Sequence, residues 1–172
     1  MHKDMGLVSQ VFDQSVLERL PGQLAIGHNR YSTTGGSLAC NVQPLIESFL
    51  GKSGSQQVAV AHNGNLTNTA TLAREQGVTG VSSDSELMLD IISKKVNDER
   101  SDARGLEMAL MEVLPRFEGA FSLVVMDQGR LVGVRDPHGF RPLCLGRIGA
   151  NAWVFASETA ALDLVGATFV RD

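Results

Sequence analysis

Residues 120–157, AFSLVVMDQGRLVGVRDPHGFRPLCLGRIGANAWVFAS, contain four short runs rich in Val, Leu, Ile and Phe that follow one another closely. Runs of this kind are typical of β-strands. The Gln-Gly, Pro-His-Gly and Gly-Ala-Asn segments between them are typical of turns. Strands joined by such short turns pair in antiparallel order. We therefore predict an antiparallel meander with strands at Ala120–Asp127, Arg130–Arg135, Pro142–Arg147 and Ala152–Ser157.

Helical patterns lie upstream and downstream of this segment. Ser83 and Glu86 have the spacing of a capping box, and apolar residues recur behind them at helical intervals, which predicts a helix that begins near Ser83. A second apolar stripe covers Leu106–Leu114 and ends at Pro115. A third, short helix is predicted just after Ser157.

Two further strands are predicted at Gln23–His28 and Gln57–His62. The order of elements does not show the strand-helix-strand alternation that builds a parallel sheet. We therefore predict an α+β fold, with residues 1–172 in one domain. Gly51–Gln56 and Asn97–Gly105 are rich in polar residues and glycine, and we expect both to be surface loops.

Composition excludes several function classes. The chain has 15 Lys+Arg against 19 Asp+Glu and a formal charge of −4, so we expect neither nucleic acid nor an anionic membrane surface as a partner. The longest apolar runs, such as Leu123–Met126, are far shorter than the roughly 20 residues that cross a membrane. No apolar segment typical of a signal peptide follows residues 1–6, which predicts a cytoplasmic location.

The common cofactor motifs are absent. Gly51–Ser53 is similar to the end of a phosphate-binding loop, but Ile46 stands where that loop needs its first glycine. The histidines are scattered, and Cys40 and Cys144 lie far apart in the sequence. We expect neither a metal site nor a disulfide framework in this chain.

Three polar clusters, within residues 27–36, 61–68 and 82–86, carry the chemistry that remains. Arg30 offers a planar fork for a carboxylate, and Thr33 can add a hydroxyl. Asn63 supplies an amide donor and Gly64 an unobstructed backbone N–H, the pair that an oxyanion requires. Asp84 can receive an ammonium group. A ligand with a carboxylate, an ammonium and an amide is an amino acid amide, and glutamine is the candidate.

Each residue also has a purely structural interpretation. Arg30 could form an ion pair within the fold. Asn63 and Gly64 could make a type I′ turn between strands, and Asp84 could simply favour the dipole of its helix. The conjunction of the three clusters favours the ligand site.

At these residues the chain resembles the N-terminal glutaminase domain of the amidophosphoribosyltransferase family, which belongs to the class II glutamine amidotransferases. The stretch from Arg135 to Leu143 distinguishes that family from the sugar-phosphate-aminating relatives. The resemblance covers nearly the whole chain and is carried by Gly6–Val8, Gly27–Tyr31, Asn41–Leu45, Ala61–Asn68, Ser83–Glu86, Arg135–Leu143, Ala156–Thr159 and Val165–Asp172.

The resemblance implies a four-layered αββα sandwich of the N-terminal-nucleophile hydrolase type. It also implies that Arg30 and Thr33 hold the glutamine carboxylate, that Asp84 holds the ammonium, and that Asn63 and Gly64 form the oxyanion hole. Tyr31 would lie on a loop that closes over glutamine. We interpret Arg135–Pro142 as mainly structural, because its proline and glycine residues dictate a turn.

The chain departs from this family in two ways. The N-terminal cysteine nucleophile of the family has no counterpart here, and we expect Cys40 and Cys144 to be buried, inert thiols. We also expect that the chain ends, at Asp172, before a phosphoribosyltransferase domain could begin. We therefore expect an internal fragment, incomplete at its N-terminus, that binds glutamine at most.

The resemblance implies further properties of the full-length parent enzyme. It would make 5-phosphoribosylamine from glutamine and phosphoribosyl pyrophosphate, form a homo-oligomer and use Mg²⁺. Some family members carry an iron–sulfur cluster, for which two cysteines supply too few ligands. Two alternatives stay open: a non-catalytic glutamine-binding module, or a fragment of another class II amidotransferase.

Overall fold

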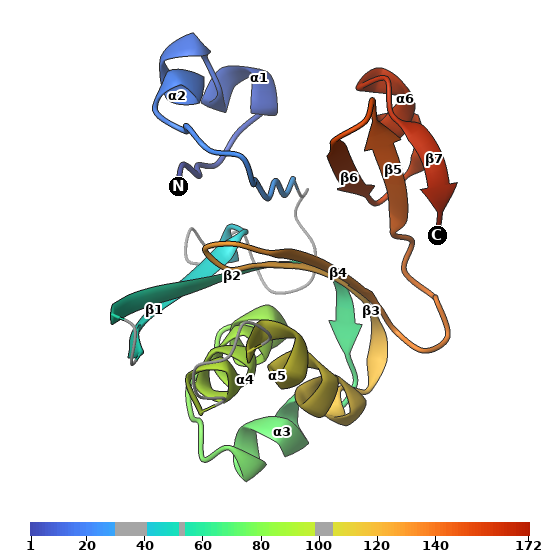
Figure 1. Ribbon diagram of the computed structural model, residues 1–172. Coiled ribbons are helices and arrows are strands. Elements are labelled where there is room, and N and C mark those ends of the chain that lie inside the picture. The colour runs from blue at the N-terminus through green and yellow to red at the C-terminus, as the bar shows by residue number, and fades with distance from the viewer. Residues whose placement is uncertain (30–40, 52–53, 99–104) are drawn as a thin grey trace.

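The computed structural model describes residues 1–29, 41–51, 54–98 and 105–172. The described residues form two antiparallel sheets (Figure 1). The larger has the order β1-β2-β3-β4, formed by Leu45–Gly51, Gly54–Leu66, Gly119–Met126 and Leu131–Arg135. The smaller has the order β6-β5-β7, in which β5 is Cys144–Ile148, β6 is Ala152–Ala156 and β7 is Thr168–Arg171.

The helices that follow β2 in the chain lie on the outer faces of the two sheets (Figure 1). α3 (Thr69–Glu75), α4 (Asp84–Asp98) and α5 (Gly105–Val113) lie on one face of the larger sheet (Figure 1). α5 continues into a 3₁₀ turn, η2 (Leu114–Arg116), where Pro115 ends the helix. α6 (Thr159–Leu164) covers the smaller sheet, and α1 (Val8–Val11) and α2 (Gln14–Glu18) precede the sheets in the chain.

Two close contacts with glycine show how the layers stack. Gly133 of β4 faces the ring of Phe155 of β6, which a Cβ at position 133 would overlap, so the two sheets meet face to face. Gly146 of β5 faces Leu162 of α6 in the same way. A cavity of about 1210 Å³ lies between the sheets. The order is therefore helix, sheet, sheet, helix, which agrees with the predicted αββα sandwich.

The hydrophobic core has a large part and a small part. The large part fills the space between the larger sheet and its helices, and its fully buried members include Leu87, Ile92, Leu106, Phe121 and Leu123. The small part, under the smaller sheet, is built from Cys144, Leu162 and Ala167. The larger sheet thus has far more apolar support than the smaller one.

The predicted helices are confirmed. α4 begins at Asp84, next to the predicted Ser83, and the Glu86 N–H donates to Ser83 Oγ at 3.2 Å. In a capping box the Glu86 carboxylate would accept from the Ser83 N–H. Here it accepts from the N–H of the preceding residue, Ser82, at 2.7 Å. α5 and α6 lie where the apolar stripe and the segment after Ser157 predict them.

The predicted meander is wrong in its connection between sheets. β3 pairs with β4, and β5 pairs with β6, but β4 and β5 belong to different sheets. Asp136 explains the break, because its carboxylate binds backbone N–H groups of the loop that follows. A loop organised around a buried carboxylate leaves the sheet instead of folding back as a hairpin.

Other elements differ from the sequence-based expectation. Gln23–His28 is irregular, with no partner strand in the described part of the chain. Gly51–Gln56 is not a loop throughout, since Gly51 ends β1 and Gly54 begins β2. Most of the loop expected at Asn97–Gly105 lies outside the described residues. Sequence patterns also missed the short or weakly patterned elements α1, α2, α3, β1 and β7.

Candidate functional site

The candidate site lies where β2 extends beyond β1. Pairing of β1 with β2 ends at Leu45 opposite Val60, whereas pairing of β2 with β3 continues to Leu66 opposite Gly119. One edge of β2 therefore has no strand partner over its last residues, among the parts of the chain that the structure describes. Backbone N–H groups at this edge are available to side chains and ligands.

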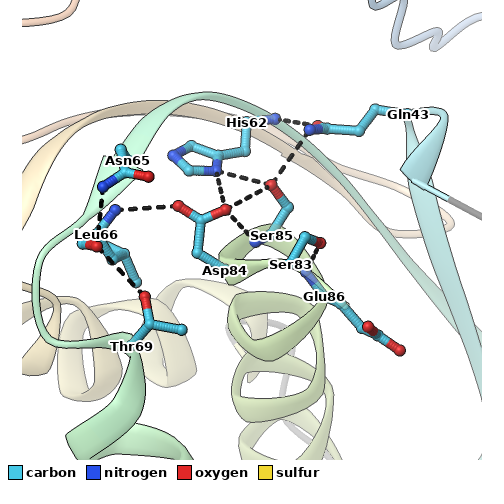
Figure 2. A network of polar contacts seen from close by, with 9 residues as sticks. All are labelled: Gln43, His62, Asn65, Leu66, Thr69, Ser83, Asp84, Ser85 and Glu86. Carbon is cyan, nitrogen blue, oxygen red and sulfur yellow. Dashed lines mark hydrogen bonds and ion pairs between the residues drawn. The ribbon is translucent and has the colours of Figure 1, made fainter. Parts of the chain in front are cut away.

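Side chains cap this edge at both ends (Figure 2). The His62 N–H donates to Gln43 Oε1 at 2.6 Å. Four residues further on, the Leu66 N–H donates to Asp84 Oδ2 at 3.0 Å. Since successive N–H groups of an extended strand point to alternate edges, the Gly64 N–H lies on the same edge, midway between the two capped groups.

Gly64 is held closely against β3. It lies opposite Phe121 in the register, and its φ of +148° is one that favours glycine. A Cβ at this position would lie 2.7 Å from Phe121 Cα, so no other residue fits without movement of the main chain. The alternative that Asn63 and Gly64 form a type I′ turn is wrong, because both residues lie inside β2 and pair with β3.

Asn63 and His62 occupy opposite faces of the larger sheet, because side chains alternate along a strand. His62 is buried toward α4, and its Nδ1 lies 2.9 Å from Ser85 Oγ and 3.8 Å from Asp84 Oδ1. Asn63 is half-buried on the face turned toward the smaller sheet. The Asn63 side-chain amide and the Gly64 N–H are hydrogen-bond donors on adjacent residues of β2, and a paired donor site for an anionic oxygen needs two donors of this kind.

Asp84 is fixed at the start of α4 but is not fully enclosed. Its Oδ1 accepts from the Ser85 N–H at 2.8 Å, its Oδ2 accepts from Leu66, and 17% of its side chain is exposed. The Gly64 and Leu66 N–H groups are about 7 Å apart at the rise of a β-strand. A donor pair and a carboxylate at this separation suit an extended amino acid that carries a side-chain amide.

Gln43, Ser85 and His62 form a buried polar cluster that sequence reasoning missed. Gln43 Nε2 donates to Ser85 Oγ at 3.2 Å, so the residue that caps β2 also reaches α4. All three are buried. The sequence contains one signal for this cluster, which is the polar residue Ser85 on the inward side of the first turn of the predicted helix. Nothing around Gln43 indicated a strand cap.

The structure places Asn63 and Gly64 next to each other on β2, and it bonds Asp84 to Leu66 of the same strand, two residues beyond Gly64. Arg30, Thr33 and Tyr31 lie outside the described residues, and so does Cys40. Cys144 is buried in β5, where its Sγ donates to the Ala156 carbonyl at 3.2 Å, in the sheet that does not carry the candidate site. Its predicted burial is confirmed.

The described ranges contain neither a candidate metal site nor a candidate membrane-spanning helix. No group of three or more His, Cys, Asp or Glu side chains is placed to hold a metal ion. No helix there is both long and apolar enough to cross a membrane.

Comparison with known proteins defines the class. The family described as glutamine amidotransferase domain matches residues 28–164, which include the whole candidate site. The chain belongs to this family. Its similarity to amidophosphoribosyltransferases, predicted from the sequence motifs, is confirmed by individual relatives.

Three of these relatives are the amidophosphoribosyltransferases of Mycobacterium leprae, Synechococcus elongatus and Arabidopsis thaliana (isoform 2, chloroplastic), with identities of 46%, 47% and 46%. The matches cover 99%, 100% and 98% of this chain, but only 31%, 35% and 29% of the relatives. The chain thus spans about a third of their length.

Solved structures confirm the fold. One is described as the allosteric regulatory enzyme of purine biosynthesis, with 37% identity and a TM-score of 0.82. Another is glutamine phosphoribosylpyrophosphate amidotransferase from B. subtilis in complex with ADP and GMP, with 38% identity and a TM-score of 0.81. Each match covers 99% of this chain and 35% of the other. The αββα sandwich is therefore of the N-terminal-nucleophile type.

Proposed function

We propose that residues 1–172 are a class II glutamine amidotransferase domain that binds glutamine, and that the domain supplies ammonia within an amidophosphoribosyltransferase. The observation that carries this proposal is the geometry of the β2 edge. Asn63 and Gly64 offer two donors there, and the carboxylate of Asp84 is bonded to the same strand two residues further on.

The proposed binding mode follows from charge. The α-ammonium of glutamine lies against Asp84, and its side-chain carbonyl accepts from Asn63 and Gly64. When a nucleophile attacks that carbonyl, negative charge develops on its oxygen and both hydrogen bonds strengthen. Arg30 and Thr33 are proposed to hold the α-carboxylate, and Tyr31 is proposed to cover the bound ligand.

The nucleophile is proposed to be a cysteine that is not among these 172 residues. Cys144 is a poor substitute, because its thiol is buried in the other sheet and donates to Ala156. The chain alone is therefore proposed to bind glutamine without hydrolysing it. The second candidate function is that of a non-catalytic module that only binds glutamine. It agrees with the position of Cys144, the one described cysteine, in the other sheet.

The remaining chemistry is assigned to the parent protein. A phosphoribosyltransferase domain of the same chain would use the ammonia to make 5-phosphoribosylamine, with Mg²⁺, in a homo-oligomer. The described residues hold no group that fits a metal ion, and two cysteines do not fit an iron–sulfur cluster. The cytoplasmic location stays a prediction, and three relatives from Arabidopsis thaliana are named as chloroplastic.

The test uses the full-length parent protein with either glutamine or free ammonia as the nitrogen source. Asn63→Ala is expected to lower kcat with glutamine by about 10²–10³ and to leave ammonia-dependent synthesis unchanged. KM for glutamine should change little, because the lost bond is strongest in the transition state.

Asn65→Ala is the matched control. Asn65 lies on the same strand and face, and its side chain donates only to the Leu66 carbonyl, at 3.0 Å, among the described contacts. This variant should keep normal glutamine turnover. If both asparagine variants behave alike, or if Asn63→Ala loses both activities equally, Asn63 is not an oxyanion donor.

A further inference from the structure

Asp136 is a buried carboxylate just beyond the end of β4. Only 3% of the residue is exposed. Its Oδ1 accepts from the His138 N–H at 2.8 Å, and its Oδ2 accepts from the Phe140 N–H at 3.1 Å and the Arg141 N–H at 3.4 Å. Burial raises the pKa of Asp136, but hydrogen bonds from backbone N–H groups outweigh burial and hold that pKa below its usual value. The group is therefore an anion at neutral pH.

Asp136 also binds β3, through both its carboxylate and its main chain. The Phe121 N–H donates to Asp136 Oδ2 at 3.1 Å, and the Asp136 N–H donates to the Phe121 carbonyl at 2.8 Å. Regular pairing of β3 with β4 ends one step earlier, at Ser122 opposite Arg135. Asp136 thus fixes both polar main-chain groups of Phe121 where strand pairing no longer does so.

Phe121 transmits this constraint to the candidate site. It is the direct partner of Gly64 across the β2–β3 pair, and the two main chains approach so closely that a Cβ on Gly64 would lie 2.7 Å from Phe121 Cα. The Phe121 ring is fully buried and packs edge-on against Phe117, with ring centroids 6.2 Å apart. A shift of the Phe121 main chain therefore displaces Gly64.

We propose that Asp136 is a positioning residue for the donors at Asn63 and Gly64, and that it acts through the main chain of Phe121. This inference rests on the proposed function of the β2 edge. It gives a role in catalysis to a segment that the sequence alone indicates to be structural. The competing interpretation is that Asp136 only shapes the loop at residues 137–142.

The experiment compares two aspartates, one at each end of the β3–β4 strand pair, in the full-length parent protein. Asp127, the control, also accepts from two backbone N–H groups of a turn, those of Gly129 at 2.9 Å and Arg130 at 2.8 Å. Each is changed to asparagine, which keeps the shape and removes the charge. Glutamine turnover, ammonia-dependent synthesis and thermal melting are measured for both variants.

Asp136→Asn is expected to lower kcat with glutamine by about tenfold or more, because small displacements of a catalytic group cost up to about 10² in rate. KM for glutamine and synthesis from free ammonia should stay within about twofold of the parent values. Asp127→Asn should keep its kcat, even if it melts at a lower temperature. A general loss of folded protein would also lower the apparent kcat at constant KM, but it would lower both activities together. Retained synthesis from free ammonia, with kcat expressed per folded molecule, therefore separates positioning from misfolding.

The proposal is overturned if kcat per folded molecule is unchanged in Asp136→Asn, or if both nitrogen sources lose activity equally. If Asp136→Asn does not fold, Asp136→Glu is measured instead, because glutamate keeps the charge but moves the carboxylate. Reduced glutamine turnover in that variant supports the positioning role, and normal turnover refutes it. An unmodified parent that hydrolyses no glutamine would instead refute the proposed function, which is a separate outcome.

Discussion

Gly64→Ala tests the close approach of β2 to β3 at the centre of the candidate site. The new methyl group would lie 2.7 Å from Phe121 Cα and 3.0 Å from the Ala120 carbonyl carbon. Both are main-chain atoms of a paired strand, so they cannot rotate away as the end of a side chain would. The φ of +148° adds backbone strain for any residue with a Cβ.

The expected cost has two parts. Strain at an unfavourable φ costs about 1–3 kcal/mol, and overpacking a filled site costs about 1–3 kcal/mol. Together they predict a loss of about 2–6 kcal/mol. That is a large part of the roughly 5–15 kcal/mol by which small domains are stable.

Gly77→Ala separates strain from overpacking. Gly77 follows α3 with a φ of +64°, and a Cβ there would meet nothing within 4 Å. Its substitution is expected to cost about 1–2 kcal/mol, from backbone conformation alone. Urea unfolding of both variants, followed by circular dichroism, gives the comparison. If Gly64→Ala loses no more free energy of unfolding than Gly77→Ala, the close approach does not constrain this position.

Three further outcomes are expected. Asp84→Asn should raise KM for glutamine at least about tenfold and spare ammonia-dependent synthesis, because it removes the charge that faces the ammonium but keeps an acceptor for Leu66; unchanged KM would contradict this. The pKa of Asp136 lies below its ordinary 3.8, so its contribution is complete above about pH 4 and is lost as pH falls through the folded-state value. Urea unfolding from pH 7 to pH 2 should show the stability gap between the parent and Asp136→Asn closing only at the acid end, and a gap that does not change with pH would refute this. Cys144→Ala should leave glutamine turnover in the parent unchanged, because the thiol donates to Ala156 in the other sheet, and lost turnover per folded molecule would make that thiol functional.

Sequence patterns predicted the fold where local signals agree with long-range packing. The apolar strands β2 and β3 and the capped helix α4 all have strong local patterns, and all belong to the large core. β1 was missed because Glu47 and Ser48 interrupt its apolar run. The meander prediction was wrong because turn residues do not show whether the chain returns to the same sheet, and Asp136 directs it away.

The candidate site, like the fold, could be predicted only where local sequence signals are sufficient. Asn63, Gly64 and Asp84 have side-chain or backbone groups whose chemistry is readable from residue type. The capping of β2 by Gln43 and the burial of Ser85 depend on contacts between segments far apart in the sequence. No periodic pattern encodes such contacts, so they became visible only in the folded chain.

The unequal division of the core has a consequence for how the domain opens. Amide hydrogen exchange reports the free energy of each opening event, and segments with little buried apolar area open at lower cost. The smaller sheet rests on Cys144, Leu162 and Ala167 and forms a weak cooperative unit, whereas β2 and β3 lie in the strong one. We therefore expect amides of β5–β7 to exchange well before those around Gly64, and the β2 edge at the candidate site to stay folded through fluctuations that release the other half of the sandwich.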